Sequence, residues 1–284
     1  MSIFMSPQEL YDVIHQAQRY TLLAALWGVG DDDGEGQFNS LHIPTAQLCD
    51  ASAALAGLPG SKDGRNPIPD PRQLQSWFER WGIRNGRPVI VYDEGRGLFA
   101  GRAWWMLRWA GVKDVRILDG GLVNWCNHEF PTLTGPGNIS VESDAVVSPQ
   151  DEMVATIDDV HSHTGVLIDS REPNRFAGRR ENLDLKAGHI PGAVNIPDRL
   201  LRNADHTWKS AAEIRDIFQR AGINHDNVAD AIVYSGSGNH SAATLAAMES
   251  VGLMGARHFV GGWSQWSADP TNPVERGDRS SVTQ

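Results

Sequence analysis

The stretch Ala231-Ile-Val-Tyr-Ser-Gly-Ser-Gly-Asn-His-Ser-Ala-Ala-Thr-Leu-Ala-Ala-Met-Glu-Ser250 decides how this chain folds. Its apolar run ends at Tyr234 and is typical of a buried strand, and Gly236 and Gly238 then mark a turn. Ala, Leu and Met recur at helical spacing in the residues that follow, which predicts a helix entered directly from the turn. A strand, a glycine loop and a helix gather backbone N–H groups around one point, at the positive end of the helix dipole. The stretch therefore predicts an anion cradle, with Ser235 at its rim.

The same pattern occurs twice along the chain, about 142 residues apart. The matched segments are His42-Ile-Pro-Thr-Ala46 with His189-Ile-Pro-Gly-Ala193, Trp81-Gly-Ile83 with Ala221-Gly-Ile223, Val89-Ile-Val-Tyr92 with Ala231-Ile-Val-Tyr234, and Leu118-Asp-Gly-Gly121 with Phe259-Val-Gly-Gly262. Chance could produce one such pair, but four in the same order indicate a tandem duplication with copies of about 130 residues, a normal domain size. We expect a first domain at 1–135, a linker at 136–150, and a second domain, which carries the glycine loop, at 151–284.

Each copy alternates predicted helices with predicted strands. Helices are expected at 7–18, 71–81, 153–161 and 211–221, and strands at 20–27, 89–92, 115–118, 166–169, 231–234 and 258–260. This alternation predicts an α/β fold of two similar domains, each a mostly parallel sheet flanked by helices. Ligands of such sheets bind beyond the carboxyl ends of the strands, which is where residues 235–240 would lie.

Composition and charge exclude several classes of protein. With 284 residues, of which 40% are hydrophobic, the chain has the composition of a globular protein with a sizeable core. It has no run of eighteen apolar residues and no basic segment followed by an apolar run near its start, so we expect a cytoplasmic protein without a membrane span. A formal net charge of −10 disfavours nucleic acids and anionic membranes as partners. An anionic substrate must therefore be attracted by a local field.

The cysteines and histidines predict neither a disulfide nor a metal site. Cys49 and Cys126 are the two cysteines, far apart in sequence and outside any loop-helix setting, so we expect reduced, buried packing residues. His161 and His163 lack the further ligands that zinc requires. We expect no metal and no cofactor.

The segment Tyr234-Ser-Gly-Ser-Gly238, followed by a helix, resembles the active-site loop of the rhodanese sulfurtransferases. Gly188-His-Ile-Pro-Gly-Ala193, Leu118-Asp-Gly-Gly121 and Gly261-Gly-Trp-Ser-Gln-Trp266 extend the resemblance over almost the whole chain. In that family the loop begins with a cysteine that carries sulfur as a persulfide, and the Gly-Ser-Gly continuation is more similar to the 3-mercaptopyruvate branch than to the thiosulfate branch. The resemblance implies a sulfurtransferase that moves sulfane sulfur from thiosulfate or 3-mercaptopyruvate to a thiol or cyanide.

Ser235 stands where the resemblance places the catalytic cysteine. A cysteine thiol ionises near pH ~8.5, and a helix N-terminus lowers that value into the useful range. A hydroxyl is a much weaker acid and a far poorer sulfur acceptor, so we expect the chain as it stands to be inactive in sulfur transfer. Two origins fit the serine, a natural substitution and a deliberate replacement of cysteine that traps an inactive form. The chain carries no tag or other mark of construction, which favours the natural one.

The resemblance also implies roles for residues near the loop. Arg175 resembles the family arginine that holds the anionic group of the substrate, since an arginine fork binds a carboxylate or sulfonate with two bonds. The alternative is a surface arginine paired with Glu172. Asp169 and Arg171 are expected to form a structural ion pair at the strand end. The other predicted substrate-binding residues are Gly236, Ser237, Gly238, Asn239 and His240.

Two histidines need separate interpretation. His240, the last residue of the cradle, could donate to an anion or act as a base toward Ser235, although a solvated loop histidine is the favoured interpretation. His189 lies in the His-Ile-Pro turn that both copies share, so a structural role is expected for it.

The first copy departs from the family pattern. Asp93 holds the position that matches Ser235, and a carboxylate at the rim of the cradle would repel an anion, so we expect the first copy to be inactive. Asp93 would then help to wall the cleft, or be a solvated loop residue. Ala24-Ala-Leu-Trp27 replaces the family's Asp-x-Arg, and Asn66 stands where some relatives place histidine. These changes argue against a contribution of the first copy to substrate binding.

Two other classes of function remain open. The retained Gly236, Gly238 and Arg175 suit a non-catalytic module that binds a small oxyanion or an acidic protein partner. A serine hydrolase or phosphatase-like enzyme is less supported, because neither Ser235 nor Ser237 has glycine at both −2 and +2 and no Asp–His pair is evident in the sequence.

Overall fold

The fold is described from a computed structural model over residues 2–28, 34–140 and 142–278. The chain divides into two compact units of similar construction. Unit 1 comprises residues 1–57, 68–150 and 204–208, and unit 2 comprises residues 58–67, 151–203 and 209–284. Each unit therefore contains a short segment from the other sequence copy.

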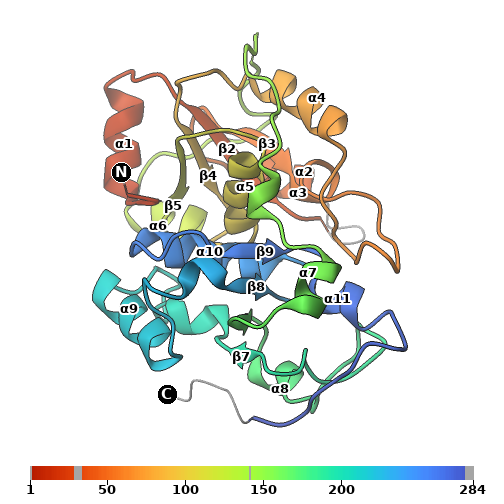
Figure 1. The fold of residues 1–284 in the computed structure, drawn as a ribbon. Coiled ribbons are helices and arrows are strands. Elements are labelled where there is room, and N and C mark those ends of the chain that lie inside the picture. The colour runs from red at the N-terminus through yellow and green to blue at the C-terminus, as the bar shows by residue number, and fades with distance from the viewer. Residues whose placement is uncertain (1, 29–33, 141, 279–284) are drawn as a thin grey trace. The chain divides into compact units, whose positions relative to one another are not determined.

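Unit 1 is built on a five-stranded parallel sheet (Figure 1) with the order β1-β5-β4-β2-β3. Its strands are β1 (Phe4–Met5), β2 (Thr21–Leu26), β3 (Gln47–Asp50), β4 (Val89–Tyr92) and β5 (Val115–Leu118). Its helices are α1 (Pro7–His15), α2 (Gly34–Ser40), α3 (Ala51–Ala54), α4 (Pro71–Trp81), α5 (Leu98–Trp109) and α6 (Gly121–Asn127). Helix α5 packs on β2, β4 and β5, so the sheet is covered by the helix that follows the first glycine loop.

The starts of the helices follow local capping chemistry. Before α1, the Ser6 hydroxyl accepts the backbone N–H of Glu9 while the Glu9 carboxylate accepts the backbone N–H of Ser6. Helix α4 starts at Pro71, where the Asp70 carboxylate accepts the backbone N–H of Arg72. The helix is terminated by Gly82, whose φ of 58° lies in the left-handed region that glycine tolerates. These signals explain why the predicted helix at 71–81 has the same bounds in the structure.

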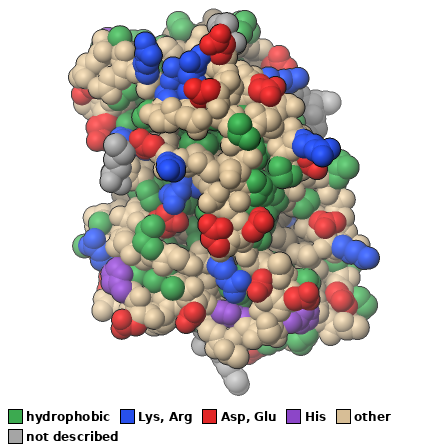
Figure 2. Space-filling view, turned by 45° about the horizontal axis from the view of Figure 1, so that its top comes forward, with side chains coloured by type: hydrophobic (Ala, Val, Ile, Leu, Met, Phe, Trp, Pro, Cys, Tyr) green, Lys and Arg blue, Asp and Glu red, His purple; other side chains and the backbone are tan. Residues whose placement is uncertain are grey.

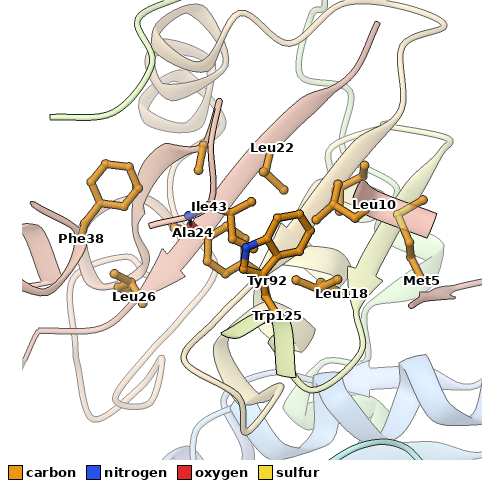
Figure 3. Close-up of a cluster of buried hydrophobic side chains, with 12 residues drawn as sticks. Met5, Leu10, Leu22, Ala24, Leu26, Phe38, Ile43, Tyr92, Leu118 and Trp125 are labelled. Carbon is orange, nitrogen blue, oxygen red and sulfur yellow. Dashed lines mark hydrogen bonds between the residues drawn. The ribbon is translucent and has the colours of Figure 1, made fainter. Parts of the chain in front are cut away.

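The core of unit 1 gathers apolar side chains from β2, β4, β5, α1 and α6 (Figure 3). Leu22, Tyr92 and Trp125 are at most 1% exposed, and the Tyr92 hydroxyl accepts the backbone N–H of Ile43 at 3.2 Å. The ring of this tyrosine thus adds apolar contact area while its hydroxyl is hydrogen-bonded.

Unit 2 has a four-stranded parallel sheet with the order β7-β6-β8-β9. Its strands are β6 (Leu167–Asp169), β7 (Val194–Asn195), β8 (Ile232–Tyr234) and β9 (Arg257–Phe259). Its helices are α7 (Ile157–Ser162), α8 (Pro173–Phe176), α9 (Ala211–Arg220), α10 (Asn239–Ser250) and α11 (Gly262–Trp266), with the short 3₁₀ helices η1 (Asp151–Met153), η2 (Asp198–Leu201) and η3 (Val228–Asp230). Helix α10 packs on β8 and β9, as α5 does on its own sheet.

Matching hydrogen bonds show the duplication in three dimensions. The Tyr234 hydroxyl accepts the backbone N–H of Ile190 at 3.2 Å, as Tyr92 does with Ile43. His189 Nδ1 bonds to the Phe176 carbonyl at 2.8 Å and stacks on that ring, and the first copy repeats this arrangement with its own histidine and phenylalanine. The expected structural role of His189 is therefore confirmed.

The predicted fold class, two domains with parallel, helix-flanked sheets, is confirmed. Two helix boundaries were predicted wrongly. The helix expected to reach Gln18 ends at His15. The helix expected from Met153 begins at Ile157, because the Thr156 hydroxyl caps it by accepting the Asp159 N–H. Strand β1 has no sequence signal, since two residues are too few to show a period.

Cys49 and Cys126 are free thiols. Cys49 is fully buried, and burial raises the pKa of its thiol, whereas Cys126 is partly exposed rather than buried as expected. Within the described ranges, no helix has the length and apolarity needed to cross a bilayer. On the face drawn in Figure 2, acidic and basic side chains are interspersed and form no single-sign field.

Candidate active site in the second unit

The glycine loop of unit 2 has a rigid backbone. Gly238 caps α10 with φ 88°, a conformation that side chains other than glycine rarely adopt. The Ser235 carbonyl accepts the N–H of Trp263 at 2.7 Å. A Cβ on Gly262 would lie 2.3 Å from that carbonyl oxygen, so only glycine permits this close contact. The loop is therefore held both by its own helix and by the start of α11.

The matching loop of unit 1 shows what this backbone binds. Asp93 Oδ1 accepts the N–H groups of Gly95 at 3.0 Å and Gly97 at 2.9 Å. Its Oδ2 accepts those of Phe99 at 3.0 Å and Ala100 at 3.3 Å. Asp93 is 1% exposed, so the expectation of a rim or solvated carboxylate is wrong. The short side chain points into the ring of N–H groups at the start of α5 and fills the cradle as its own anion.

In unit 2 the Ser235 hydroxyl takes the place of that carboxylate. Ser235 is fully buried, and its Oγ accepts the N–H of Gly238 at 3.1 Å. The same Oγ lies 3.1 Å from Ser241 Oγ, which in turn lies 2.7 Å from His258 Nε2. The nucleophile position is thus neutral and is connected to a buried imidazole.

Two arginines lie directly against the loop. A Cβ on Gly236 would be 3.1 Å from Arg65 Nη2 and 3.4 Å from Arg175 Nη1. Arg175 Nη2 donates to Glu181 Oε1 at 2.9 Å and to Asp184 Oδ2 at 2.9 Å, and Arg65 Nη1 donates to Asp184 Oδ1. Within the described residues Arg175 Nε, although buried, donates to no acceptor. Arg175 thus retains donor capacity toward a ligand.

The two carboxylates beneath these arginines differ in how firmly they are charged. Burial favours the neutral form of Glu181, but backbone N–H groups, among them that of Leu183, together with Arg175 outweigh burial and lower its pKa. Burial raises the pKa of Asp184 despite the opposing Arg65. An incoming anion must compete with both carboxylates for the arginines.

The alternative pairing of Arg175 with Glu172 is wrong. Glu172 accepts from Arg199 Nε at 2.8 Å instead. The predicted pair of Asp169 with Arg171 is confirmed, with Arg171 Nη2 2.7 Å from Asp169 Oδ2. Arg171 also donates to a backbone carbonyl and lies 4.6 Å above the ring of Trp263, so it joins the end of β6 to α11.

The rim of the loop carries an Asp–His pair. His240 Nδ1 lies 2.6 Å from Asp198 Oδ1, and the side chain of His240 is 42% exposed, so this histidine is partly solvated and also paired with a carboxylate that was not evident in the sequence. Burial opposes the charged imidazole, but the Asp198 carboxylate outweighs it and raises the pKa of His240. Burial likewise opposes the charge of Asp198, but His240 lowers its pKa. The Asp198 carboxylate thus favours the protonated form of the rim imidazole.

The predicted substrate-binding residues lie together on this loop and beside it. Gly236 faces both arginines, Ser237 Oγ accepts from Asn66 Nδ2 at 2.9 Å, and Asn239 Oδ1 is buried with no donor among the described residues. Six further residues of the site were not predicted: Arg65, Glu181, Asp184, Asp198, Ser241 and His258. Among the described residues, no group of three or more His, Cys, Asp or Glu is placed to hold a metal.

Comparison with known proteins agrees with this geometry. The Rhodanese-like domain family matches residues 10–128 and again residues 150–269. The chain belongs to the rhodanese-like family. SseB of Mycobacterium tuberculosis, provisionally named a thiosulfate sulfurtransferase, is 34% identical over 280 residues, which are 97% of each chain. A protein of Pseudomonas aeruginosa, named a probable 3-mercaptopyruvate sulfurtransferase, is 34% identical over 255 residues, 86% of this chain and 88% of its own.

A solved structure shows the same rhodanese-like architecture. The crystal structure of SseA from Escherichia coli, a 3-mercaptopyruvate sulfotransferase, superposes with a TM-score of 0.79 at 29% sequence identity. The match covers 93% of this chain and 100% of SseA. The repeat found in the sequence is thus the tandem arrangement of two rhodanese-like domains.

Proposed function

We propose that this protein has the scaffold of a rhodanese-type sulfurtransferase, which moves sulfane sulfur from thiosulfate or 3-mercaptopyruvate to a thiol or cyanide acceptor through position 235. The names of the relatives in M. tuberculosis and P. aeruginosa support this reaction class. The observation that carries the proposal is the cradle around Ser235, with the Gly238 N–H on its hydroxyl and Arg65 and Arg175 against Gly236.

The nucleophile decides whether this scaffold turns over. A thiolate in the cradle would attack the outer sulfur of thiosulfate, from which sulfite leaves, or the sulfur of 3-mercaptopyruvate, whose C–S bond breaks as pyruvate leaves in its enolate form. The loop N–H groups would stabilise the resulting persulfide, and Arg175 would orient the anionic donor. A serine hydroxyl stays protonated at neutral pH and forms no comparable bond to sulfane sulfur. We therefore expect negligible sulfur transfer from the protein with Ser235.

A paired assay tests this function. The protein and its Ser235→Cys variant are compared with cyanide as acceptor, once with thiosulfate and once with 3-mercaptopyruvate. The expected result is activity in the variant alone, and the faster donor identifies the branch. Sulfur transfer by the unaltered protein at the rate of cysteine-bearing relatives would refute the requirement for cysteine. A variant inactive on both donors would refute the intact scaffold.

A second candidate, a non-catalytic module that binds a small oxyanion, is favoured by one observation. The carboxylate of Asp93 accepts four N–H groups in the matching loop, so this backbone binds anions without any chemistry. Calorimetry with sulfate, thiosulfate, phosphate and 3-mercaptopyruvate tests this candidate. Binding of any of them supports it, and the absence of heat with all four contradicts it.

A further inference from the structure

Three buried polar side chains form a chain of hydrogen bonds beneath the loop. Ser235, Ser241 and His258 are each fully buried and come from the loop, the first turn of α10 and β9. Ser235 Oγ lies 3.1 Å from Ser241 Oγ, and Ser241 Oγ lies 2.7 Å from His258 Nε2. Burying polar groups costs free energy unless they are hydrogen-bonded. An apolar side chain at position 241 would break the connection between Ser235 and His258.

One arrangement of the protons links both hydroxyls to His258 Nε2 and places the imidazole proton on Nδ1. The Gly238 N–H donates to Ser235 Oγ, which leaves the Ser235 proton to be donated. Ser241 Oγ can accept that proton and donate its own to His258 Nε2, since a serine hydroxyl has one proton and two lone pairs. In this arrangement both hydroxyl protons point toward the imidazole. The Gly238 N–H meanwhile stabilises negative charge on Ser235 Oγ.

We infer that Ser235 is an activated oxygen nucleophile and that Ser241 and His258 carry its proton away. Histidine accepts protons in the physiological pH range. In other enzymes with a serine nucleophile the base takes the serine proton directly, and here the Ser241 hydroxyl would pass that proton on to His258. A hydroxyl is unsuited to holding sulfane sulfur, but a hydroxyl with a base attacks a phosphorus centre.

The surroundings of Ser235 indicate a phosphate ester as the substrate class. Backbone N–H groups at a helix N-terminus bind phosphate oxygens, and arginine forks bind them with two bonds. Arg65 and Arg175 lie against Gly236, next to the hydroxyl, and now hold the Asp184 carboxylate. A phosphate would take the place of that carboxylate and bring its phosphorus toward the buried Ser235.

The reaction balances with groups on this chain and water. Ser235 Oγ forms a bond to phosphorus as the bond from phosphorus to the leaving alcohol oxygen breaks. The Ser235 proton passes to Ser241 Oγ while the Ser241 proton passes to His258 Nε2, and the leaving oxygen takes a proton from solvent. Water then attacks the phosphorus of the phosphoserine and gives up one proton to solvent, the bond from phosphorus to Ser235 Oγ breaks as inorganic phosphate leaves, and the proton on His258 Nε2 returns through Ser241 to Ser235.

Two measurements on the full chain test this inference. A fluorophosphonate reagent should phosphonylate Ser235, detected by peptide mass spectrometry, and the chain should hydrolyse p-nitrophenyl phosphate. His258→Gln and Ser241→Ala should each slow both reactions by about a hundredfold or more, the usual contribution of general-base catalysis. Ser241→Thr, which keeps a hydroxyl, should retain the rate. Ser250→Ala removes another hydrogen-bonded serine of α10 and is the matched control.

The outcomes separate the parts of the inference. Absence of a Ser235 adduct in the folded chain refutes an activated nucleophile, and equal labelling of the unaltered chain, His258→Gln and Ser241→Ala refutes the relay. Labelling without hydrolysis of p-nitrophenyl phosphate refutes the substrate class. Thermal melting of each variant distinguishes loss of the relay from loss of the fold. None of these results depends on sulfur transfer by Ser235→Cys, so the two proposals stand or fall separately.

Discussion

Removing the carboxylate of Asp93 should destabilise unit 1 strongly. Its two oxygens accept four backbone N–H groups at 2.9–3.3 Å and are 1% exposed, so Asp93→Ala leaves four donors in a nearly buried cradle. A hydrogen bond to a charged group contributes about 1.5–3 kcal/mol, and each buried donor left unsatisfied costs about 1–3 kcal/mol. These terms are not additive in one cluster and water will enter part of the space, so we expect a total loss of about 3–5 kcal/mol.

Urea unfolding followed by circular dichroism measures this loss. Asp12→Ala removes the same charge from the exposed face of α1 and should leave stability nearly unchanged. Formate should restore part of the stability of Asp93→Ala and none of that of Asp12→Ala, because a free carboxylate can enter the vacated cradle. At ten times its dissociation constant the formate would return about 1.4 kcal/mol. A loss for Asp93→Ala no larger than that of Asp12→Ala would refute the interpretation of the loop as an anion cradle.

Three further changes test other contacts. Asp184→Asn removes the carboxylate that competes for the two arginines beside the loop, so the dissociation constant for sulfate, measured by calorimetry, should fall at least about tenfold. The control Asp205→Asn removes an equal charge elsewhere and should leave this constant unchanged. An unaltered affinity for sulfate in Asp184→Asn would contradict competition by the carboxylate. The raised pKa of His240 stabilises the fold below the ordinary histidine pKa of about 6.5, and this contribution is lost as pH rises through the raised value. Unfolding curves from pH 6 to 9 should show that loss, and His240→Gln should abolish it, while an identical pH dependence in both proteins excludes the pair with Asp198 as its source. Tyr234→Phe removes a hydroxyl that accepts one buried backbone N–H, and its unfolding free energy should drop by about 1–3 kcal/mol; no drop would mean that the N–H finds another acceptor.

The sequence predicted the features that depend on neighbouring residues. The strand before Ser235, the glycine loop and the helix after it follow from local periodicity and from the conformational freedom of Gly238, and the same signals in the first copy revealed the duplication. Helices with clear caps, such as the one that starts at Pro71, were bounded correctly for the same reason.

The contacts that give the site its charge could not be predicted in this way. Arg65 and Asp184 are 119 residues apart, and His240 and Asp198 are 42 apart, so no local pattern relates them. The position of Asp93 was misjudged for a different reason. The sequence showed a carboxylate at an anion-binding loop, but the carboxylate itself was not considered as the ligand of that loop.

Because each unit includes a short segment from the other sequence copy, the coding sequence cannot be divided at the linker without splitting a unit. Residues 58–67 are encoded in the first half but belong to unit 2, where Arg65 lies against Gly236 and its backbone N–H donates to Ser264 Oγ at 3.0 Å. A gene cut at the linker would therefore separate the active-site loop from one of its two arginines. Neither half is a portable module, and recombination that shuffles single copies of this repeat would transfer an incomplete site.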